Sequence, residues 1–290
     1  MNEYGEVYEN VDLKKYNTYG IGSISKYVVF PNSVDDLRKL LEYLNSNNIP
    51  WYILGKGSNV ILPDDNFEGA IIKLDKLNSY KVENDIITVE AGISLSVFIQ
   101  NLLKDGYTNY ANLFGIPGLL GGAIIGNAGA YGTSIFDNLL SVTIIDSENK
   151  IRDVAKENID FSYRYTEFKN KKIIIVEAQF QGIKGDVLVA KKEIADNLAK
   201  RKSTQPLEYK NAGSVFKNPP DMAAGKLIEQ AGLKGTSIGG AKVSLKHANF
   251  IINFNNAKSR DIIDLIELIK REVHKKFNVE LQLEQIRVIW

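Results

Sequence analysis

Residues 115–132 read GIPGLLGGAIIGNAGAYG, and seven of these eighteen residues are glycine. An even spread of the chain's 23 glycines over 290 residues would place only about one or two in such a stretch. Glycine loses more backbone freedom on folding than any other residue, so a cluster of it needs a physical reason. One reason is a bare backbone pressed against a ligand, with N–H groups that bind an anion; the other is a sharply bent core segment. The stretch is therefore the first candidate for a cofactor-phosphate site, with the bent core segment as the alternative.

A second and shorter glycine loop, GKGSN at residues 55–59, follows a strand expected at residues 51–54. It is not a P-loop, because glycine rather than serine or threonine follows the lysine. It is not a Rossmann fingerprint either, because Val60 stands where that pattern has its third glycine. Its N–H groups could still bind a pyrophosphate, although a plain turn explains the loop equally well. Two separate glycine loops suggest a long ligand with a diphosphate in its middle.

The composition is that of an ordinary globular protein, with 44% hydrophobic and 24% charged residues. A chain of 290 residues is long enough for two or three domains. The 36 basic and 35 acidic residues leave a formal charge of +1, which gives no electrostatic reason to expect a nucleic-acid or membrane partner. We therefore expect neither nucleic acid nor a membrane as a partner.

Cysteine is absent, which excludes disulfides, thiolate metal sites and cysteine nucleophiles. Only two histidines occur, so we expect no metal site. We interpret His247 as structural and His274 as a surface residue. The polar N-terminal residues lack the apolar core of a signal peptide, and no apolar run approaches the length of a membrane span. We therefore expect a cytoplasmic protein, and the lack of cysteine fits a reducing compartment.

Hydrophobic periodicity predicts helices and strands in mixed order. Ser33 has the features of a helix N-cap, with two aspartates in the first turn. Ser259 is likewise expected to cap the last long helix, and Gly106 and Gly232 to end two others. The expected strands are at residues 27–30, 51–54, 86–89, 142–145, 173–180, 250–253 and 286–289, and the expected helices at 34–44, 95–103, 189–202, 223–230 and 262–273.

Several ordered stretches carry a family resemblance. They are Asn17-Thr18, GKGSN at 55–59, the glycine-rich run at 115–132, Tyr163-Arg164, GSVFKNP at 213–219, HANF at 247–250 and the ending LEQIR at 283–287. In these stretches, and along essentially its whole length, the chain resembles the UDP-N-acetylenolpyruvoylglucosamine reductase (MurB) family. That family belongs to the flavin-binding class typified by vanillyl-alcohol oxidase.

The resemblance implies an α+β fold with a FAD-binding module of the vanillyl-alcohol oxidase (PCMH) type in two subdomains, residues 1–75 and 76–204. A C-terminal α+β substrate-binding domain at residues 205–290 is implied to follow, and its last strand could return to the FAD-binding module. The change from a helix to a proline-bearing loop near residues 203–206 independently favours a domain boundary there.

The resemblance further implies a two-step flavoenzyme. NADPH reduces a non-covalently bound FAD, and NADP⁺ leaves. The enolpyruvyl ether of UDP-N-acetylglucosamine then receives a hydride from flavin N5 at C3 and a proton at C2, which gives UDP-N-acetylmuramate, a peptidoglycan precursor. The implied FAD contacts are Gly55, Lys56, Gly57, Ser58 and Asn59 in the short loop, and Gly115, Pro117, Gly118, Gly121, Gly122, Ala123, Asn127, Ala128 and Gly129 in the long one.

Three residues have catalytic roles in the family pattern. Arg164 is the cation that stabilises the charge of an enolate-like intermediate, and its planar fork suits a carboxylate. Ser214 lies in the proton-donor position, where the residues alone would favour a loop hydroxyl or a helix cap. Glu284 is a partner in polarising the enolate or in proton delivery. The implied substrate contacts are Tyr163, Asn218 and Arg201.

The chain departs from the family pattern at Leu119-Leu120, where the family often has Thr-Val, so a hydroxyl contact to the flavin is lost. The short interval from Arg164 to Arg201 leaves no room for the tyrosine-bearing substrate loop of one subtype, so the chain resembles the shorter subtype. Two alternatives stay open: another non-covalent FAD oxidoreductase of the same fold, and a non-catalytic nucleotide-sugar or flavin-binding protein. The second should have lost one of the three catalytic residues, and all three are present.

Overall fold

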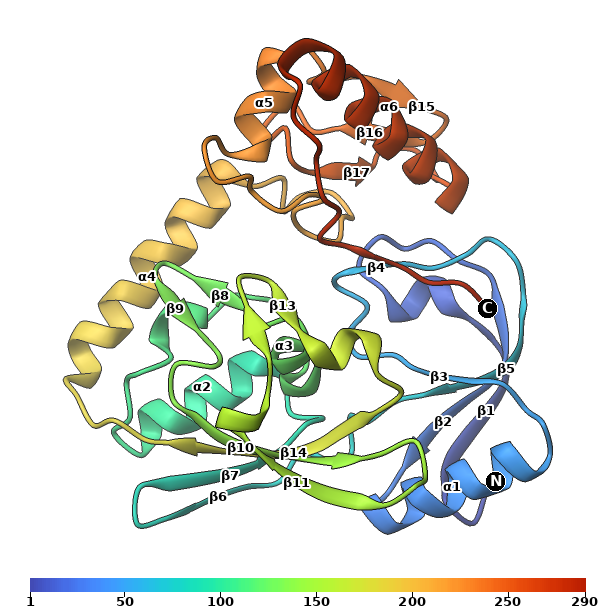
Figure 1. Cartoon of the computed structure of the whole chain (residues 1–290), viewed down its shortest axis with the longest axis vertical. Coiled ribbons are helices and arrows are strands. Elements are labelled where there is room, and N and C mark those ends of the chain that lie inside the picture. The colour runs from blue at the N-terminus through green and yellow to red at the C-terminus, as the bar shows by residue number, and fades with distance from the viewer. The chain divides into compact units, whose positions relative to one another are not determined.

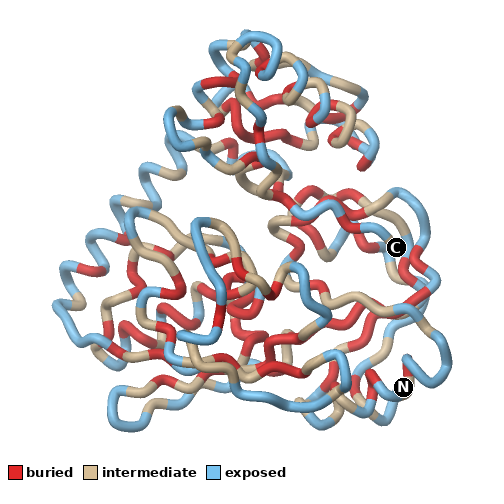
Figure 2. The backbone as a smooth tube through the Cα atoms, viewed as in Figure 1, coloured by how far each residue is buried: buried red, intermediate tan, exposed pale blue.

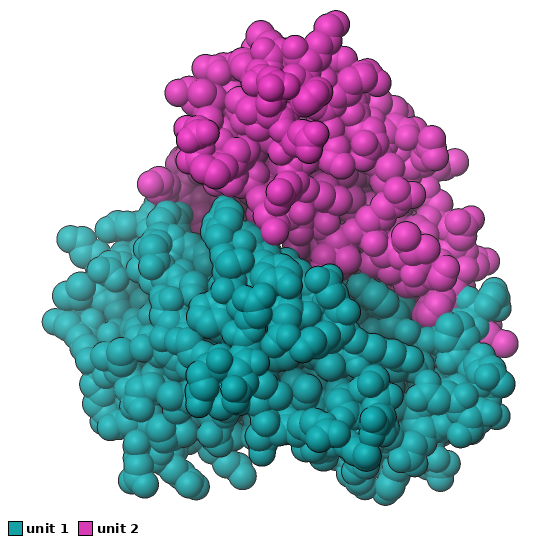
Figure 3. All heavy atoms as spheres, viewed as in Figure 1, with its two compact units in different colours: residues 1–9, 27–55, 68–199 teal, residues 10–26, 56–67, 200–290 magenta.

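The computed structural model describes all residues from 1 to 290, with helices and strands mixed along the chain (Figure 1). Buried and exposed residues are interspersed along the chain (Figure 2). The chain divides into two compact units, which are described separately (Figure 3). The first unit consists of residues 1–9, 27–55 and 68–199, and the second of residues 10–26, 56–67 and 200–290.

Each predicted helix and strand is present, with ends that differ by a few residues. The helices are α1 (Val34–Ser46), α2 (Leu95–Lys104), α3 (Leu120–Ile125), α4 (Val187–Thr204), α5 (Ala224–Gln230) and α6 (Ser259–Phe277), with 3-10 helices η1 (Leu13–Tyr16), η2 (Ala111–Leu113), η3 (Lys156–Asn158) and η4 (Glu167–Asn170). The strands are β1 (Gly5–Asp12), β2 (Ile24–Pro31), β3 (Trp51–Ile53), β4 (Val60–Ile61), β5 (Phe67–Ile72), β6 (Tyr80–Glu83), β7 (Ile86–Glu90), β8 (Gly129–Ala130), β9 (Thr133–Ser134), β10 (Leu139–Ile145), β11 (Ile151–Ala155), β12 (Phe161–Ser162), β13 (Tyr165–Thr166), β14 (Ile174–Gln181), β15 (Ser237–Ile238), β16 (Ala241–Val243), β17 (Ile251–Asn253) and β18 (Ile286–Arg287).

Two sheets organise the first unit. One has the strand order β1-β2-β5-β3, and the other has the order β11-β10-β14-β7-β6. Strands β3 and β5 run parallel, with Ile53 opposite Ile72, so the segments that leave these two strands lie side by side. The second sheet is antiparallel, and α2 and α3 share one apolar core with it. This core includes the rings of Phe98 and Phe180, which pack in a tilted arrangement with a centroid distance of 5.3 Å.

Helix α1 confirms the prediction made from its sequence. The hydroxyl of Ser33 accepts a hydrogen bond from the N–H of Asp36 at 3.1 Å, so Ser33 is the N-cap. The helix ends at Ser46, two residues beyond the expected end. Its buried residues are Leu37, Leu40, Leu41 and Leu44, at helical spacing.

The second unit contains the antiparallel sheet β15-β16-β17 together with α5 and α6. Its apolar core draws in Tyr19, Ile21 and Ile61 from much earlier parts of the chain. The final strand β18 pairs in parallel with β4, with Ile286 opposite Val60. The buried face of α6 carries Ile262, Leu265, Ile266, Ile269 and Val273.

The prediction that Ser259 caps α6 is wrong. The N-cap is Lys258, whose N–H donates to the carboxylate of Asp261 at 3.0 Å. The hydroxyl of Ser259 donates instead to the carbonyl oxygen of Leu62. The carboxylate of Asp64 accepts from the N–H groups of Ser259 and the next residue at 2.9 and 3.1 Å. The first turn is therefore capped by a residue about two hundred positions away in the sequence, which local spacing cannot reveal.

Helix α4 is longer than predicted and buries only Ala190 and Ile194. Figure 2 accordingly shows most of its length in the colours of exposed and intermediate residues. None of the helices combines the length with the apolar composition that crossing a bilayer requires.

Candidate cofactor-binding and active site

The glycine-rich segment begins as a tight turn and continues into the short helix α3. Gly115 and Gly118 have φ values of 89° and 154°, a region that side-chain-bearing residues rarely adopt. The N–H groups of Leu120 and Gly121 donate to the carbonyl oxygens of Ile93 and Ala91, both at 2.9 Å. The segment is thus fixed against the turn that precedes α2. Leu119, where the family often has threonine, is the N-cap of α3 and makes no side-chain capping bond.

Glycine occurs at two adjacent positions of α3 for different physical reasons. A Cβ on Gly121 would lie 3.0 Å from the Cβ of Ala91, so this glycine allows close packing within the protein. A Cβ on Gly122 would meet no atom within 4 Å, and Gly122 is exposed. The segment is therefore both a packed bend and a bare surface. The face at Gly122 offers open space that a ligand could use.

Asn127 provides a polar group of the kind that a cofactor site requires. The residue is buried and has a positive φ of 42°. Its Nδ2 donates to the carbonyl oxygen of Ser162 at 2.8 Å, but its buried Oδ1 has no hydrogen-bond partner within the protein. A buried acceptor without a partner is unfavourable by about 1–3 kcal/mol. The open face at Gly122 and this unsatisfied oxygen fit a bound dinucleotide cofactor.

Arg164 lies in a hairpin that packs on the glycine-rich segment. Strands β12 and β13 pair with Ser162 opposite Tyr165, so Tyr163 and Arg164 form the turn between them. Arg164 has a φ of 56°, which is unfavourable for a large side chain. Its Nη2 donates to the carbonyl oxygen of Gly129 at 2.7 Å. The guanidinium therefore contacts the segment that contains the predicted cofactor residues.

Further hydrogen bonds hold this strained hairpin in place. The hydroxyl of Thr166 donates to the carbonyl oxygen of Ile125 at 2.7 Å, which joins β13 to the end of α3. The Nζ of Lys169 donates to the carbonyl oxygen of Arg164 itself at 2.6 Å. Tyr163 is 56% exposed, with the Cζ of Arg164 5.4 Å from its ring centroid. These contacts offset the strain at Arg164 and fix the direction of its side chain.

The short loop at residues 55–59 is divided between the two units, with Gly55 in the first and the remaining residues in the second. Gly57 has a φ of 64°, and a Cβ there would lie 2.4 Å from the carbonyl oxygen of Tyr16. Its own carbonyl oxygen accepts from the N–H of Thr18 at 3.1 Å. Packing against residues 16–18 therefore accounts for Gly57, and two of the stretches singled out in the sequence are in contact.

The second unit brings Ser214 and Glu284 onto adjacent segments. The N–H of Glu284 donates to the carbonyl oxygen of Val215 at 2.8 Å, and Phe216 forms a β-bridge with Leu283. Asn59 of the short loop donates from Nδ2 to the carbonyl oxygen of Glu284 at 3.3 Å. Three stretches that are far apart in the sequence therefore meet at this point: the short loop at Asn59, residues 214–216 and residues 283–284.

Gln285 was not identified from the sequence, although it holds these segments together. It is buried, and its Nε2 donates to the carbonyl oxygens of Ala212 and Gly213 at 3.1 and 3.2 Å. Its Oε1 accepts from the hydroxyl of Tyr19 at 3.1 Å. Burial raises the pKa of Tyr19, so this phenol remains a donor. The only sign of this role in the sequence was the position of Gln285 next to Glu284. An amide side chain is not an acid or a base, so it was not a candidate catalytic residue.

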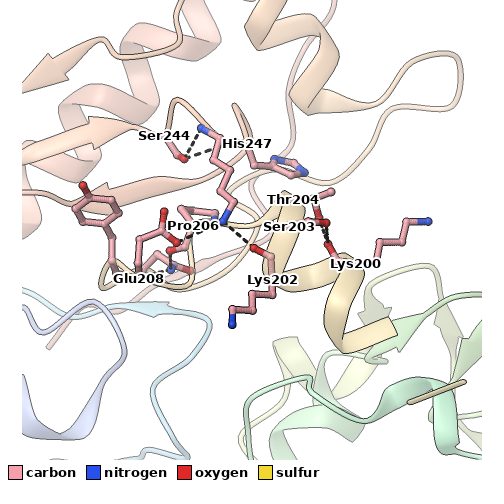
Figure 4. Close-up of polar contacts among 11 residues, drawn as sticks. Lys200, Lys202, Ser203, Thr204, Pro206, Glu208, Ser244 and His247 are labelled. Atoms are coloured by element: carbon pink, nitrogen blue, oxygen red, sulfur yellow. Dashed lines mark hydrogen bonds and ion pairs between the residues drawn. The ribbon is translucent and has the colours of Figure 1, made fainter. Parts of the chain in front are cut away.

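The remaining predicted residues lie near the ends of α4 and α5. Asn218 is exposed, and its Oδ1 accepts from the N–H of Ala224 at 3.1 Å next to the start of α5. Arg201 is half-buried in the last part of α4. Figure 4 shows the end of this helix with Lys200, Lys202, Ser203 and Thr204. The Nζ of Lys246 donates to the carbonyl oxygen of Lys202 at 2.7 Å.

His247 is structural, as predicted, and has no metal-binding neighbours. Its Nδ1 accepts from the N–H of Asn249 at 3.2 Å, and its ring packs edge-on against Phe250 with a centroid distance of 4.8 Å. Burial lowers the pKa of His247, and the charge of Lys234 lowers it further. No group of three or more histidine, cysteine or acidic residues is placed to hold a metal ion.

The predicted catalytic residues therefore fall into two groups. Arg164 belongs to the first unit, against the glycine-rich segment with Asn127 and Gly129. Ser214 and Glu284 belong to the second unit, beside Asn59. The residues in each group are assembled by hydrogen bonds within their own unit.

Comparison with known proteins identifies two family matches, which together extend over most of the chain. Residues 25–155 match the family model of an FAD binding domain. Residues 205–288 match the model of the UDP-N-acetylenolpyruvoylglucosamine reductase C-terminal domain. The predicted fold class, an α+β chain with an FAD-binding module followed by a C-terminal domain of this family, is confirmed.

Individual relatives agree over almost their full lengths. The UDP-N-acetylenolpyruvoylglucosamine reductase of Clostridium novyi (strain NT) is 40% identical over 284 residues, which cover 98% of this chain and 92% of the relative. The enzyme of the same name from Caldanaerobacter subterraneus subsp. tengcongensis is 41% identical over 285 residues, with coverage of 98% and 94%. The crystal structure of the reductase (MurB) from Thermus caldophilus has a TM-score of 0.82 at 28% identity, over 98% of this chain and 99% of the other. The chain therefore belongs to the UDP-N-acetylenolpyruvoylglucosamine reductase (MurB) family.

Proposed function

We propose that this protein reduces UDP-N-acetylenolpyruvoylglucosamine to UDP-N-acetylmuramate, with bound FAD and with NADPH as the reductant. This step belongs to the synthesis of peptidoglycan precursors. The observation that carries the proposal is the match to reductases of this name, at about 40% identity over 98% of the chain. The FAD-binding domain match at residues 25–155 supports the cofactor.

FAD, when bound, supplies the hydride chemistry that links NADPH to the enolpyruvyl double bond. The residues proposed to hold it are those of the short glycine loop and of the glycine-rich segment. Gly122 leaves space for a ligand, and Asn127 offers an acceptor that has no partner within the protein. The proposed contacts are Gly55, Lys56, Gly57, Ser58, Asn59, Gly115, Pro117, Gly118, Gly121, Gly122, Ala123, Asn127, Ala128 and Gly129.

Arg164 is proposed to stabilise negative charge on the substrate. Hydride addition to the enolpyruvyl C3 moves electron density toward C2 and the adjacent carboxylate. A guanidinium stays protonated at every relevant pH and presents a planar set of donors that matches a carboxylate. Its bond to the carbonyl of Gly129 and the strained turn beneath it hold the group in one orientation before substrate arrives.

Ser214 is proposed to donate the proton to C2, and Glu284 to assist by polarising the substrate or by relaying the proton. A serine hydroxyl is a weak acid, so it needs a basic carbanion-like centre and an oriented position. The bond from the N–H of Glu284 to the carbonyl oxygen of Val215 supports this assignment, because it fixes the two segments to each other. Tyr163, Asn218 and Arg201 are proposed to contact the substrate.

Two further assignments complete the proposal. Residues 1–75 and 76–204 would form the two parts of the FAD-binding module, and residues 205–290 would bind the nucleotide sugar. The protein would act in the cytoplasm, which the complete lack of cysteine fits because thiols are kept reduced there and disulfides have no use.

An anaerobic two-step experiment tests the function. The purified protein should be yellow and should release intact FAD on denaturation. NADPH should bleach the flavin absorbance, and UDP-N-acetylenolpyruvoylglucosamine should then restore it and yield UDP-N-acetylmuramate. Bleaching without recovery on adding this substrate would contradict the reductase assignment and favour a different FAD oxidoreductase. The absence of both bleaching and bound FAD would favour a binding protein without catalytic activity.

A further inference from the structure

Lys73 is the one charged residue among the buried polar residues of the chain, and its side chain is only 4% exposed. Burying an ammonium group is unfavourable unless the group is paired and hydrogen-bonded. The proposed reaction assigns no role to this lysine. Its burial therefore calls for a reason in its immediate surroundings.

The parallel pairing of β3 and β5 places Lys73 beside the short glycine loop. Lys73 is the first residue after β5, and Gly55 is the second residue after β3. The N–H of Leu54 donates to the carbonyl oxygen of Ile72 at 3.0 Å, so the two segments stay in register beyond the ends of the strands. The Nζ of Lys73 then donates to the carbonyl oxygen of Gly55. The buried charge thus binds the first peptide group of the loop.

This bond fixes the direction of the peptide group between Gly55 and Lys56. In a trans peptide the C=O and the N–H of one planar group point in opposite directions. Because Lys73 holds the carbonyl oxygen toward the buried side, the N–H of Lys56 points away from Lys73. Without the lysine, a loop containing two glycines could rotate this peptide group at little energetic expense.

Asp75 balances the charge of the lysine. Its Oδ2 lies 3.3 Å from the Nζ of Lys73, and its side chain is 33% exposed. The pair is therefore close to neutral as a whole. The backbone of Lys73 is also fixed, because its N–H donates to the carbonyl oxygen of Val29 at 2.8 Å. A fixed and charge-balanced donor is suited to orienting a neighbouring group.

We propose that Lys73 is a positioning residue for dinucleotide binding: by holding the Gly55 carbonyl oxygen, it orients the Lys56 N–H toward the diphosphate of FAD. The proposal rests on the proposed function, since it takes the short loop to be a cofactor loop. Lys73 does not touch the cofactor in this role, and it acts through the loop backbone.

Two measurements on Lys73→Met test the proposal. Removing the ammonium leaves the Gly55 carbonyl without its charged donor, so the dissociation constant of the apoprotein for FAD, from flavin fluorescence, should rise about tenfold or more. Amide hydrogen exchange in the apoprotein should become faster in residues 54–59 and stay unchanged in α2. Lys76→Met is the matched control, because Lys76 makes an ion pair with Glu6 and should show neither effect.

A second variant separates positioning from folding. Lys73→Met/Asp75→Asn removes both members of the pair, which is often tolerated where loss of one member is not. It should melt near the wild-type temperature and still bind FAD about tenfold or more weakly. If this double variant bound FAD as tightly as the wild-type protein, the proposed role of Lys73 would be overturned, whereas the proposed function would stand. A wild-type protein that does not bind FAD would overturn the proposed function, and with it the role of the loop.

Discussion

Asn249 and Phe216 are joined by two hydrogen bonds. The N–H of Phe216 donates to the Oδ1 of Asn249 at 3.0 Å, and the Nδ2 of Asn249 donates to the carbonyl oxygen of Phe216 at 2.8 Å. The carbonyl oxygen of Asn249 also accepts from the N–H of Val215 at 2.9 Å. This asparagine therefore pairs like a strand backbone with the residues that follow Ser214.

Asn249→Ala should destabilise the protein. It should also slow the proton-transfer step, because Asn249 holds the residues that follow Ser214. Both polar groups of Phe216 would be buried without their partner, which is unfavourable by about 1–3 kcal/mol for each. Urea denaturation of the apoprotein measures the loss of stability. Asn255→Ala, at an exposed asparagine nearby, is the control and should change the unfolding free energy little. Similar stabilities for the two variants would show that the paired hydrogen bonds contribute nothing measurable.

Ser214→Ala should separate the two half-reactions. NADPH should bleach the flavin at the wild-type rate, because flavin reduction needs no proton from this residue. Recovery of colour with substrate should slow by about 10²–10⁴-fold, the usual contribution of a positioned acid. Stopped-flow absorbance measures both rates. Ser203→Ala, at an exposed serine near the end of α4, should leave both rates unchanged. Equal slowing of both half-reactions in Ser214→Ala would argue against proton donation by Ser214.

Gly121→Ala and Gly122→Ala should have opposite effects on the apoprotein. The methyl group at 121 would press on Ala91, and overpacking of this kind lowers stability by about 1–3 kcal/mol. The methyl group at 122 would enter open space, and alanine favours a helix over glycine by about 1 kcal/mol.

Gly122→Ala should nevertheless weaken FAD binding, because its methyl group would fill the space assigned to the cofactor. Melting temperature of the apoprotein and the dissociation constant for FAD measure the two properties independently. A Gly122→Ala variant that binds FAD as tightly as the wild-type protein would show that the cofactor does not approach this face.

His247 should make the second unit less stable in acid. Its pKa in the folded protein is lowered from 6.5, chiefly by burial, whereas the unfolded chain keeps the ordinary value. Below about pH 6.5 the unfolded state therefore binds more protons, so stability falls as the pH decreases toward the folded pKa and levels off below it. His247→Gln should make the unfolding free energy less dependent on pH between pH 7 and pH 5 (roughly the histidine range). An unchanged pH profile in His247→Gln would exclude this residue as the cause.

Much of the fold was predictable because its determinants are local. Ser33, the two aspartates after it and the leucine spacing define α1 without any tertiary information. The two glycine loops and the ordered motifs identified the family, because each motif is contiguous in the sequence. The contacts that connect Ser214 with Glu284 could not be read directly, since they join segments seventy residues apart.

The sequence fails where a distant partner decides a residue's role. Serine is a common N-cap residue, but the carboxylate of Asp64, from another segment, accepts the hydrogen bonds of the first N–H groups of α6 instead of Ser259. Gly57 suggests a ligand, whereas the backbone at residues 16–18 already requires a glycine there. Lys73 looks like one of many surface lysines, and only the parallel register of β3 and β5 reveals its burial.

The pairing of β18 with β4 has a consequence for how the protein is made. Strand β4 ends at Ile61, but the strand that pairs with it contains residues 286 and 287, which are synthesised more than two hundred residues later. Until these two residues have been made, Val60 and Ile61 cannot form their parallel pairing. The second unit can therefore complete its fold only after both of these distant segments have left the ribosome.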